Sequence, residues 1–240
     1  MKNAKKIVAL LLCAVLLVGA SVMGTLAYMT SQDEVVNTFT VGKVEIKLDE
    51  APVDENGKEI TGNRVHANEY HLLPGVEYDK DPMVTVIKNS ERCYVRMFVT
   101  INNSADLDAI FAEKQLNLGD IFNLQNGWTL KHVTPNLAVA DTRTYEFWYD
   151  TAVEKNATQD SPLAPLFTTI TMPGTVDNDD LASLADDPDT EADESFKIWV
   201  VAQAIQTAGF KSNENTDADA MVEAFAAAPK IEGENLIPSV

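Results

Sequence analysis

The stretch Cys93-Tyr94-Val95-Arg96-Met97-Phe98-Val99-Thr100-Ile101 decides the fold. Side chains of a strand alternate between the two faces of its sheet, so the odd-numbered residues share one face and the even-numbered residues the other. Both faces carry large side chains, which is typical of a central strand packed on each side. The same position predicts that Cys93 is a buried, inert thiol rather than a reactive one.

Further strand-like stretches lie on both sides of this strand and are separated by turn residues. Val44, Ile46 and Leu48 alternate with charged residues, and Asn56-Gly57 and Pro74-Gly75 are typical of turns. The remaining predicted strands span residues 83–87, 128–133, 142–149, 167–172 and 196–205. Short strands punctuated by turns predict a mainly β fold, an antiparallel β-sandwich of two packed sheets.

Three short stretches predict helical insertions. Ser104 is expected to cap a helix over residues 105–115, and residues 181–185 are expected to form one helical turn. Residues 216–219, Thr-Asp-Ala-Asp, resemble a capping box ahead of a helix over 220–228, which Pro229 ends. Residues 212–240 are therefore expected to form a C-terminal helix and tail behind a β-sandwich domain over residues 28–211.

The first 27 residues have the three-part pattern of a signal peptide. Lys2, Lys5 and Lys6 precede an apolar run over residues 7–18, and Thr25-Leu26-Ala27 offers small residues at a cleavage site between Ala27 and Tyr28. The alternative is a membrane anchor, because residues 7–32 carry no charge. Cleavage makes the membrane contact transient, and the mature chain is then secreted to the extracellular matrix or the cell surface.

The charge of the chain excludes one class of partner. Its 37 acidic residues outnumber its 18 basic ones, for a formal net charge of −19. Loss of the three leader lysines brings the mature charge to −22. A nucleic-acid partner is not expected, because a phosphate backbone is held by an excess of Lys and Arg. Cleavage also removes Cys13, so Cys93 remains without an internal disulfide partner.

Two groups of residues are weak candidates for metal ligands. His66, Glu69 and His71 lie close together, but a zinc-protease helix needs histidines four residues apart with Glu directly after the first. We expect surface histidines in a loop instead. Asp177, Asp179 and Asp180 begin a run of nine acids over residues 177–194, which predicts either a calcium loop or a solvated excursion. No catalytic motif appears, so the sequence favours neither an enzyme nor a cofactor.

Several motifs in the leader and the mature chain form a recurring pattern. The leader motif covers residues 24–30 and continues into Asn37-Thr38-Phe39-Thr40-Val41-Gly42, and weaker motifs lie in residues 73–77, 81–86, 93–96 and 202–206. Together they resemble the TasA/camelysin family of secreted proteins from Gram-positive bacteria. Met29 stands where the family usually has Phe, and Asp33 comes later than the usual acidic residue. The resemblance implies processing by a SipW-type signal peptidase and a jelly-roll β-sandwich.

The resemblance also implies a function. TasA-like members build biofilm-matrix fibres by donor-strand addition, in which the mature N-terminal segment of one subunit joins the sheet of the next. The donor would lie within residues 28–41, with Phe39 and Val41 as anchors. The partner would be an identical subunit or an accessory fibre protein. Alternatively, this segment forms the first strand of its own sheet.

Two other functions stay open. The camelysin branch is described as metalloproteases, although this sequence has no recognisable zinc ligand set. A surface-binding module that does not assemble, and that uses its acidic loop to bind ligands, is the third hypothesis.

Overall fold

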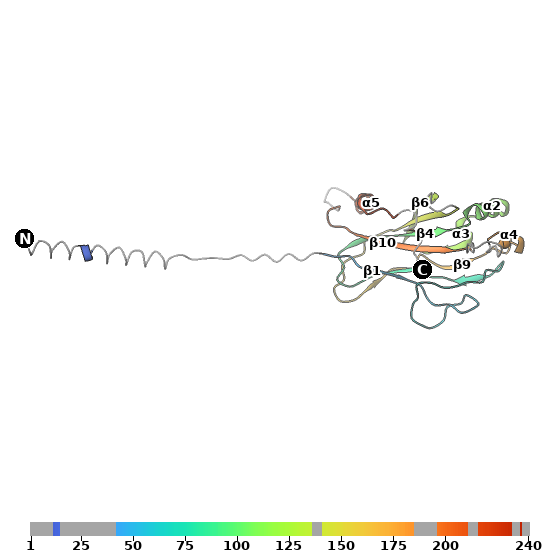
Figure 1. Cartoon of the computed structure of the whole chain (residues 1–240), viewed down its shortest axis with the longest axis horizontal. Coiled ribbons are helices and arrows are strands. Elements are labelled where there is room, and N and C mark those ends of the chain that lie inside the picture. The colour runs from blue at the N-terminus through green and yellow to red at the C-terminus, as the bar shows by residue number, and fades with distance from the viewer. Residues whose placement is uncertain are drawn as a thin grey trace, which may run out of the picture. The chain divides into compact units, whose positions relative to one another are not determined.

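The computed structural model describes residues 12–14, 42–135, 141–184, 196–210, 216–231 and 236. The chain divides into two units, Met1–Val41 and Gly42–Val240, and every strand and helix named below belongs to the second. Figure 1 labels these elements.

One sheet has four antiparallel strands in the order β10-β4-β7-β6. Its strands are β10 (Ile198–Gln206), β4 (Cys93–Ile101), β7 (Arg143–Tyr149) and β6 (Trp128–Pro135). All nine residues of β4 are buried, because β10 and β7 flank it and both of its faces are covered. The predicted central strand is therefore confirmed, and Figure 1 shows β4 and β10 side by side.

Six shorter strands form two three-stranded sheets in the orders β1-β3-β8 and β2-β9-β5. They are β1 (Ile46–Asp49), β2 (Glu77–Asp79), β3 (Met83–Val86), β5 (Phe122–Leu124), β8 (Ser161–Pro162) and β9 (Phe167–Thr171). The two sheets continue into each other. Lys80 donates its backbone N–H to Thr168, and Leu166 donates to Pro82, across the breaks between the named strands. The fold is thus mainly β, with antiparallel pairing throughout the named strands.

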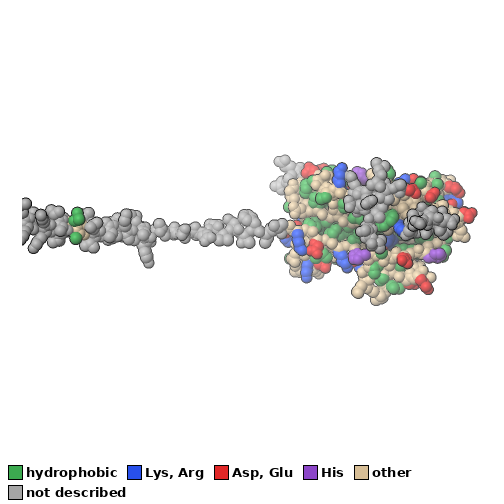
Figure 2. Space-filling view, in the orientation of Figure 1, with side chains coloured by type: hydrophobic (Ala, Val, Ile, Leu, Met, Phe, Trp, Pro, Cys, Tyr) green, Lys and Arg blue, Asp and Glu red, His purple; other side chains and the backbone are tan. Residues whose placement is uncertain are grey.

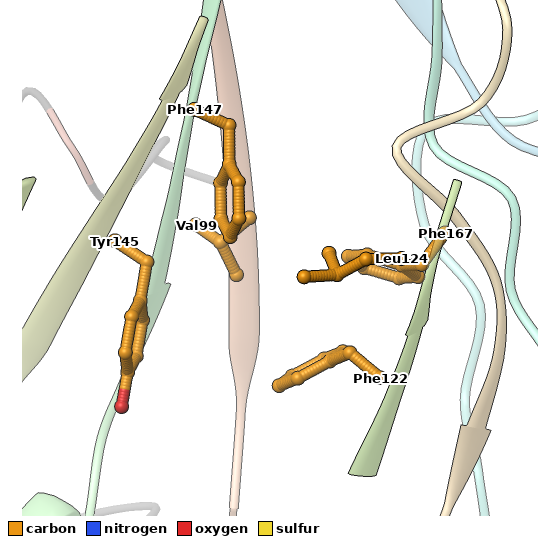
Figure 3. A pocket seen from close by; sticks show the side chains of 6 residues that line it. All are labelled: Val99, Phe122, Leu124, Tyr145, Phe147 and Phe167. Atoms are coloured by element: carbon orange, nitrogen blue, oxygen red, sulfur yellow. The ribbon is translucent and has the colours of Figure 1, made fainter. Parts of the chain in front are cut away.

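The main hydrophobic core lies between the four-stranded sheet and the shorter strands. The odd-numbered side chains of β4 point into it, together with residues such as Val84, Phe167 and Ile170. Figure 3 shows part of this contact, where Val99, Tyr145 and Phe147 face Phe122, Leu124 and Phe167. The space between the two groups is too narrow to admit a water molecule. It is a packing seam of the core and not a ligand cavity.

Helix α5 (Asp217–Ala227) covers the opposite face of the four-stranded sheet. Met221 and Phe225 of α5 pack on Tyr94 and Trp148, which belong to β4 and β7. The predicted capping box is confirmed: the Thr216 side chain accepts from the Asp219 backbone, and Asp219 accepts from Thr216. A helix with a small apolar face thus gives β4 its second buried side.

Helix α2 (Ser104–Lys114) forms where the sequence predicts it, but its cap is different. Ser104 lies inside the first turn, and the N-cap residue is Asn103 with a left-handed backbone and no side-chain cap bond. Asp141 takes the capping role from a distant part of the chain. Its Oδ1 accepts from the Ala105 backbone at 2.7 Å and from the Ser104 hydroxyl at 3.0 Å. The Ser104 prediction is wrong because the helix begins one residue earlier, so Ser104 lies inside it, and the Asp141 carboxylate binds the first turn instead.

Two shorter helices complete the described elements, α3 (Leu118–Ile121) and α4 (Asn178–Ser183). Helix α4 overlaps the helical turn expected over residues 181–185 but begins three residues earlier. Asp177 caps it and forms a capping box with Asp180, which fixes its start.

Candidate functional site

The outer strands of the four-stranded sheet are β10 and β6. Such edges carry backbone N–H and C=O groups without partners, so natural proteins usually protect them against pairing with other chains. The two edges of this sheet differ in that respect. We call the outward side of β10, residues Ile198–Gln206, the β10 edge.

Hydrogen bonds to β4 show which groups of β10 point outward. Asn102 donates to Lys197, and Thr207 donates to Arg92, so the odd-numbered residues of this segment bond to β4. In an antiparallel pair, bonding alternates along the strand. The even-numbered residues Ile198, Val200, Ala202, Ala204 and Gln206 therefore direct their N–H and C=O groups away from β4. In the part of the chain that the structure describes, no strand pairs with this side.

The β10 edge lacks features that oppose strand pairing. Its nine residues include no charge, no proline and no bulge. Strand β6 at the other edge has all three, namely Lys131, Pro135 and a register shift between Leu130 and His132. Because β6 is protected and β10 is not, β10 is the edge suited to pair with another strand.

The core-facing side of β10 is apolar and half-buried. Ile198, Val200, Ala202 and Ala204 pack against the main core. Strand β1 flanks β10, with Cα atoms within 8 Å but without strand pairing. Since Ile87 donates to Glu45, Ile46 and Leu48 also direct their backbone groups away from β3. A strand added at the β10 edge would thus meet apolar side chains of both sheets.

A buried polar network holds β10 in place on the face of the sheet that α5 covers. Arg96 of β4 is 7% exposed, and its Nε and Nη2 donate to Gln203 Oε1 at 2.8 and 2.5 Å. Its Nη1 pairs with Glu146 at 2.8 Å, and Trp148 Nε1 donates to the same carboxylate at 2.6 Å. The guanidinium also lies 4.7 Å from the ring centroid of Phe225. These contacts hold the middle of β10 flat against β4.

The predicted metal candidates do not come together in the structure. His66, Glu69 and His71 are all exposed in the long connection between β1 and β2. Among the described residues, no group of three or more His, Cys, Asp or Glu side chains is placed to hold a metal ion.

The acidic run begins as a helix cap in the described residues. Asp177 and Asp180 accept hydrogen bonds from backbone amides at the start of α4. Lys114 at the end of α2 lies 3.1 Å from Asp180 and 3.6 Å from Asp177. The backbone bonds and this lysine hold the pKa of Asp177 below its usual range. Asp179 lies in the first turn of the helix, and residues 185–195 lie outside the described part.

Cys93 lies in the main core and is fully buried. Burial raises the pKa of its thiol to about 11, so the nucleophilic thiolate is disfavoured at neutral pH. The predicted buried thiol is confirmed.

Several predicted sites lie outside the described residues. These are the cleavage site at Ala27 and Tyr28 and the donor anchors Phe39 and Val41. No helix in the described residues has the length and hydrophobicity to cross a membrane, and most of the apolar leader run falls outside them. Figure 2 shows acidic and basic side chains scattered over the face it presents, without one dominant patch.

Comparisons with protein-family models, curated proteins and solved structures found no match. The functional argument therefore rests on the geometry of the β10 edge. In the sequence, this edge is marked by the nine uncharged residues from Ile198 to Gln206, in contrast to Lys131 and Pro135 in β6.

Proposed function

We propose that this chain is a secreted structural protein whose subunits join by adding a strand of one copy to the β10 edge of the next. The β10 edge is the observation that carries the proposal. It offers ten outward backbone groups from five residues, with neither charge nor proline to oppose pairing. Strand addition uses such groups for affinity and side-chain pockets for specificity.

We propose that each subunit of this assembly has a jelly-roll β-sandwich fold. This fold is supported by the packing of the four-stranded sheet, across one core, against a second layer of strands. In that layer β2 leads into β3 and β8 leads into β9, so its order is β1, then β2 and β3, then β8 and β9, then β5. When a strand is added at the β10 edge, the β6 edge stays protected against pairing. Growth is then head-to-tail, which produces a filament where the rotation between copies does not close a ring.

The donor segment that we propose is residues 28–41 of the neighbouring copy. Phe39 and Val41 alternate with Thr40, so both can point toward the core when the segment pairs as a strand. Ala202 and Ala204 are the smallest core-facing residues of β10 and would leave room for the Phe39 ring. Burying a phenylalanine contributes about 1.5–3 kcal/mol.

Electron microscopy and sedimentation of the chain that starts at Tyr28 test this function. We expect filaments whose yield rises with salt, because screening weakens the repulsion between acidic subunits. Deleting residues 28–41 is expected to leave monomers that bind a synthetic 28–41 peptide in a 1:1 complex. Persistent monomers of the undeleted chain at high concentration and salt would contradict the proposal. A truncated chain that ignores the peptide would contradict the choice of donor.

A further inference from the structure

The long connection between β1 and β2 is held in place by buried and half-buried charged groups. Arg64 binds Asp49 at 2.5 Å and Asp81 at 2.7 Å, and it donates to the backbone oxygens of both residues. These bonds occupy the carboxylates of Asp49 and Asp81. A second set of polar side chains lies beside them. It combines a carboxylate, an amide and an amine, from Glu50, Asn68 and Lys80.

Glu50 lies between an amine and an amide. Lys80 Nζ is 2.5 Å from Glu50 Oε2, and Asn68 Nδ2 donates to Glu50 Oε1 at 3.0 Å. Glu50 and Lys80 are 6% and 8% exposed, so bulk water has little access to the pair. Among the described residues, Glu50 is the one carboxylate in an ion pair with Lys80. One carboxyl group therefore touches both the nitrogen nucleophile and the nitrogen leaving group of an amide exchange.

We propose that Lys80 and Asn68 form an intramolecular isopeptide bond, with Glu50 as the proton carrier. Glu50 first takes a proton from the Lys80 ammonium along the 2.5 Å contact, which leaves a neutral amine and a neutral acid. The Nζ lone pair then attacks Asn68 Cγ to give a tetrahedral intermediate.

The surroundings of Asn68 suit the remaining steps. The Val53 backbone N–H donates to Asn68 Oδ1 at 3.2 Å and stabilises the negative charge that develops on that oxygen. Glu50 delivers its proton to Asn68 Nδ2, the Cγ–Nδ2 bond breaks, and ammonia leaves as the amine loses its second proton to the carboxylate. An amine and a primary amide thus become a secondary amide and ammonia, without an oxidant or reductant.

The Tyr70 ring borders the reacting amine. Its centroid lies 5.5 Å from Lys80 Nζ, and its hydroxyl donates to the Asp79 backbone. The ring therefore covers one side of the amine. The product is a covalent ring over residues 68–80. It ties the long connection to the segment between β2 and β3. This modification goes beyond strand addition and does not rest on it.

Peptide mapping of the purified chain tests the bond directly. Trypsin cuts after Arg64 and Lys88, but an acylated Lys80 resists it. We expect a single peptide of residues 65–88 that is lighter than its sequence mass by one ammonia. Separate peptides 65–80 and 81–88 at full mass would overturn the proposal. The position of the mass loss distinguishes the two sources of ammonia. Asn56-Gly57 can also lose ammonia by cyclising, but that loss would fall outside residues 65–88.

Matched variants test the roles of the three residues. Lys80→Arg keeps the cation and the tryptic site, but its side chain cannot be acylated by Asn68. This variant should therefore give peptide 65–80 at full mass. Glu50→Gln keeps the side-chain volume but cannot carry the proton, and it should abolish the mass loss. Lys58→Met removes an exposed ion pair with Asp79 and should retain the bond. A bond that forms in Glu50→Gln would overturn the role of Glu50. The map of the parent chain tests the bond even where a variant fails to fold.

Discussion

Proline at position 202 should block assembly without unfolding the subunit. The Ala202 N–H points to the outward side of β10, so a proline there removes no hydrogen bond to β4. The substitution keeps a Cβ in the core-facing position. We expect the free energy of unfolding of the monomer to change by about 1 kcal/mol or less, the scale of proline effects at compatible sites.

The effect on assembly should be much larger. A strand added to β10 would lose the hydrogen bond from residue 202, and the proline ring would separate the two strands around it. A lost hydrogen bond costs about 0.5–1.5 kcal/mol, and an acceptor left buried without a partner costs about 1–3 kcal/mol more. The sum of about 1.5–4.5 kcal/mol corresponds to association roughly 10- to 2,000-fold weaker.

The assay is the concentration at which filaments first sediment, measured beside the thermal melting of the monomer. Val133→Pro is the matched control, because Val133 also points its N–H outward, but from the β6 edge. This control should assemble like the parent chain. If Ala202→Pro assembles at the parent concentration while Val133→Pro does not, the choice of β10 is refuted.

Three further predictions concern the subunit itself. With a pKa of about 11, Cys93 should have about one thiolate per thousand molecules at pH 8, so a thiol reagent should label it only after denaturation; rapid labelling of the native chain would contradict its burial. Asp141→Ala removes the cap of α2 and should lower the free energy of unfolding in urea by about 1 kcal/mol, and an unchanged midpoint would show that the cap contributes nothing. A hydrogen bond from Arg143 lowers the pKa of Asp108, so its stabilisation is present above the unfolded value of 3.8 and is lost as the pH falls through the lowered pKa. Asp108→Asn should therefore lower the urea midpoint at pH 7 and approach the parent midpoint in strong acid; an equal difference at both pH values would contradict this.

Local periodicity explains what the sequence predicts well. The alternation in residues 93–101 gives the correct faces of β4, because side-chain direction in a strand depends only on position. The capping box at Thr216 and Asp219 is equally local, since its bonds join residues three apart. Such features need no knowledge of the rest of the chain.

Long-range contacts explain what the sequence does not reveal. Asp141 caps a helix that begins 37 residues earlier, and no pattern near Ser104 indicates it. Strands β5 and β8 have three and two residues, too few for alternation to be seen. Lys80 and Glu50 are 30 residues apart, and only the fold brings them to one side of Asn68. The β10 edge has the same origin, because strand order decides which strand lies outermost.

Hydrogen exchange of the backbone amides, measured on monomers and on filaments, tests strand addition at β10 most directly. Pairing should slow the exchange of the outward amides of Ile198, Val200, Ala202, Ala204 and Gln206 on assembly. The odd-numbered amides of β10 bond to β4 in the monomer already, and the outward amides of β6 should not change. Filaments in which the even-numbered β10 amides exchange as fast as in the monomer would contradict strand addition at this edge.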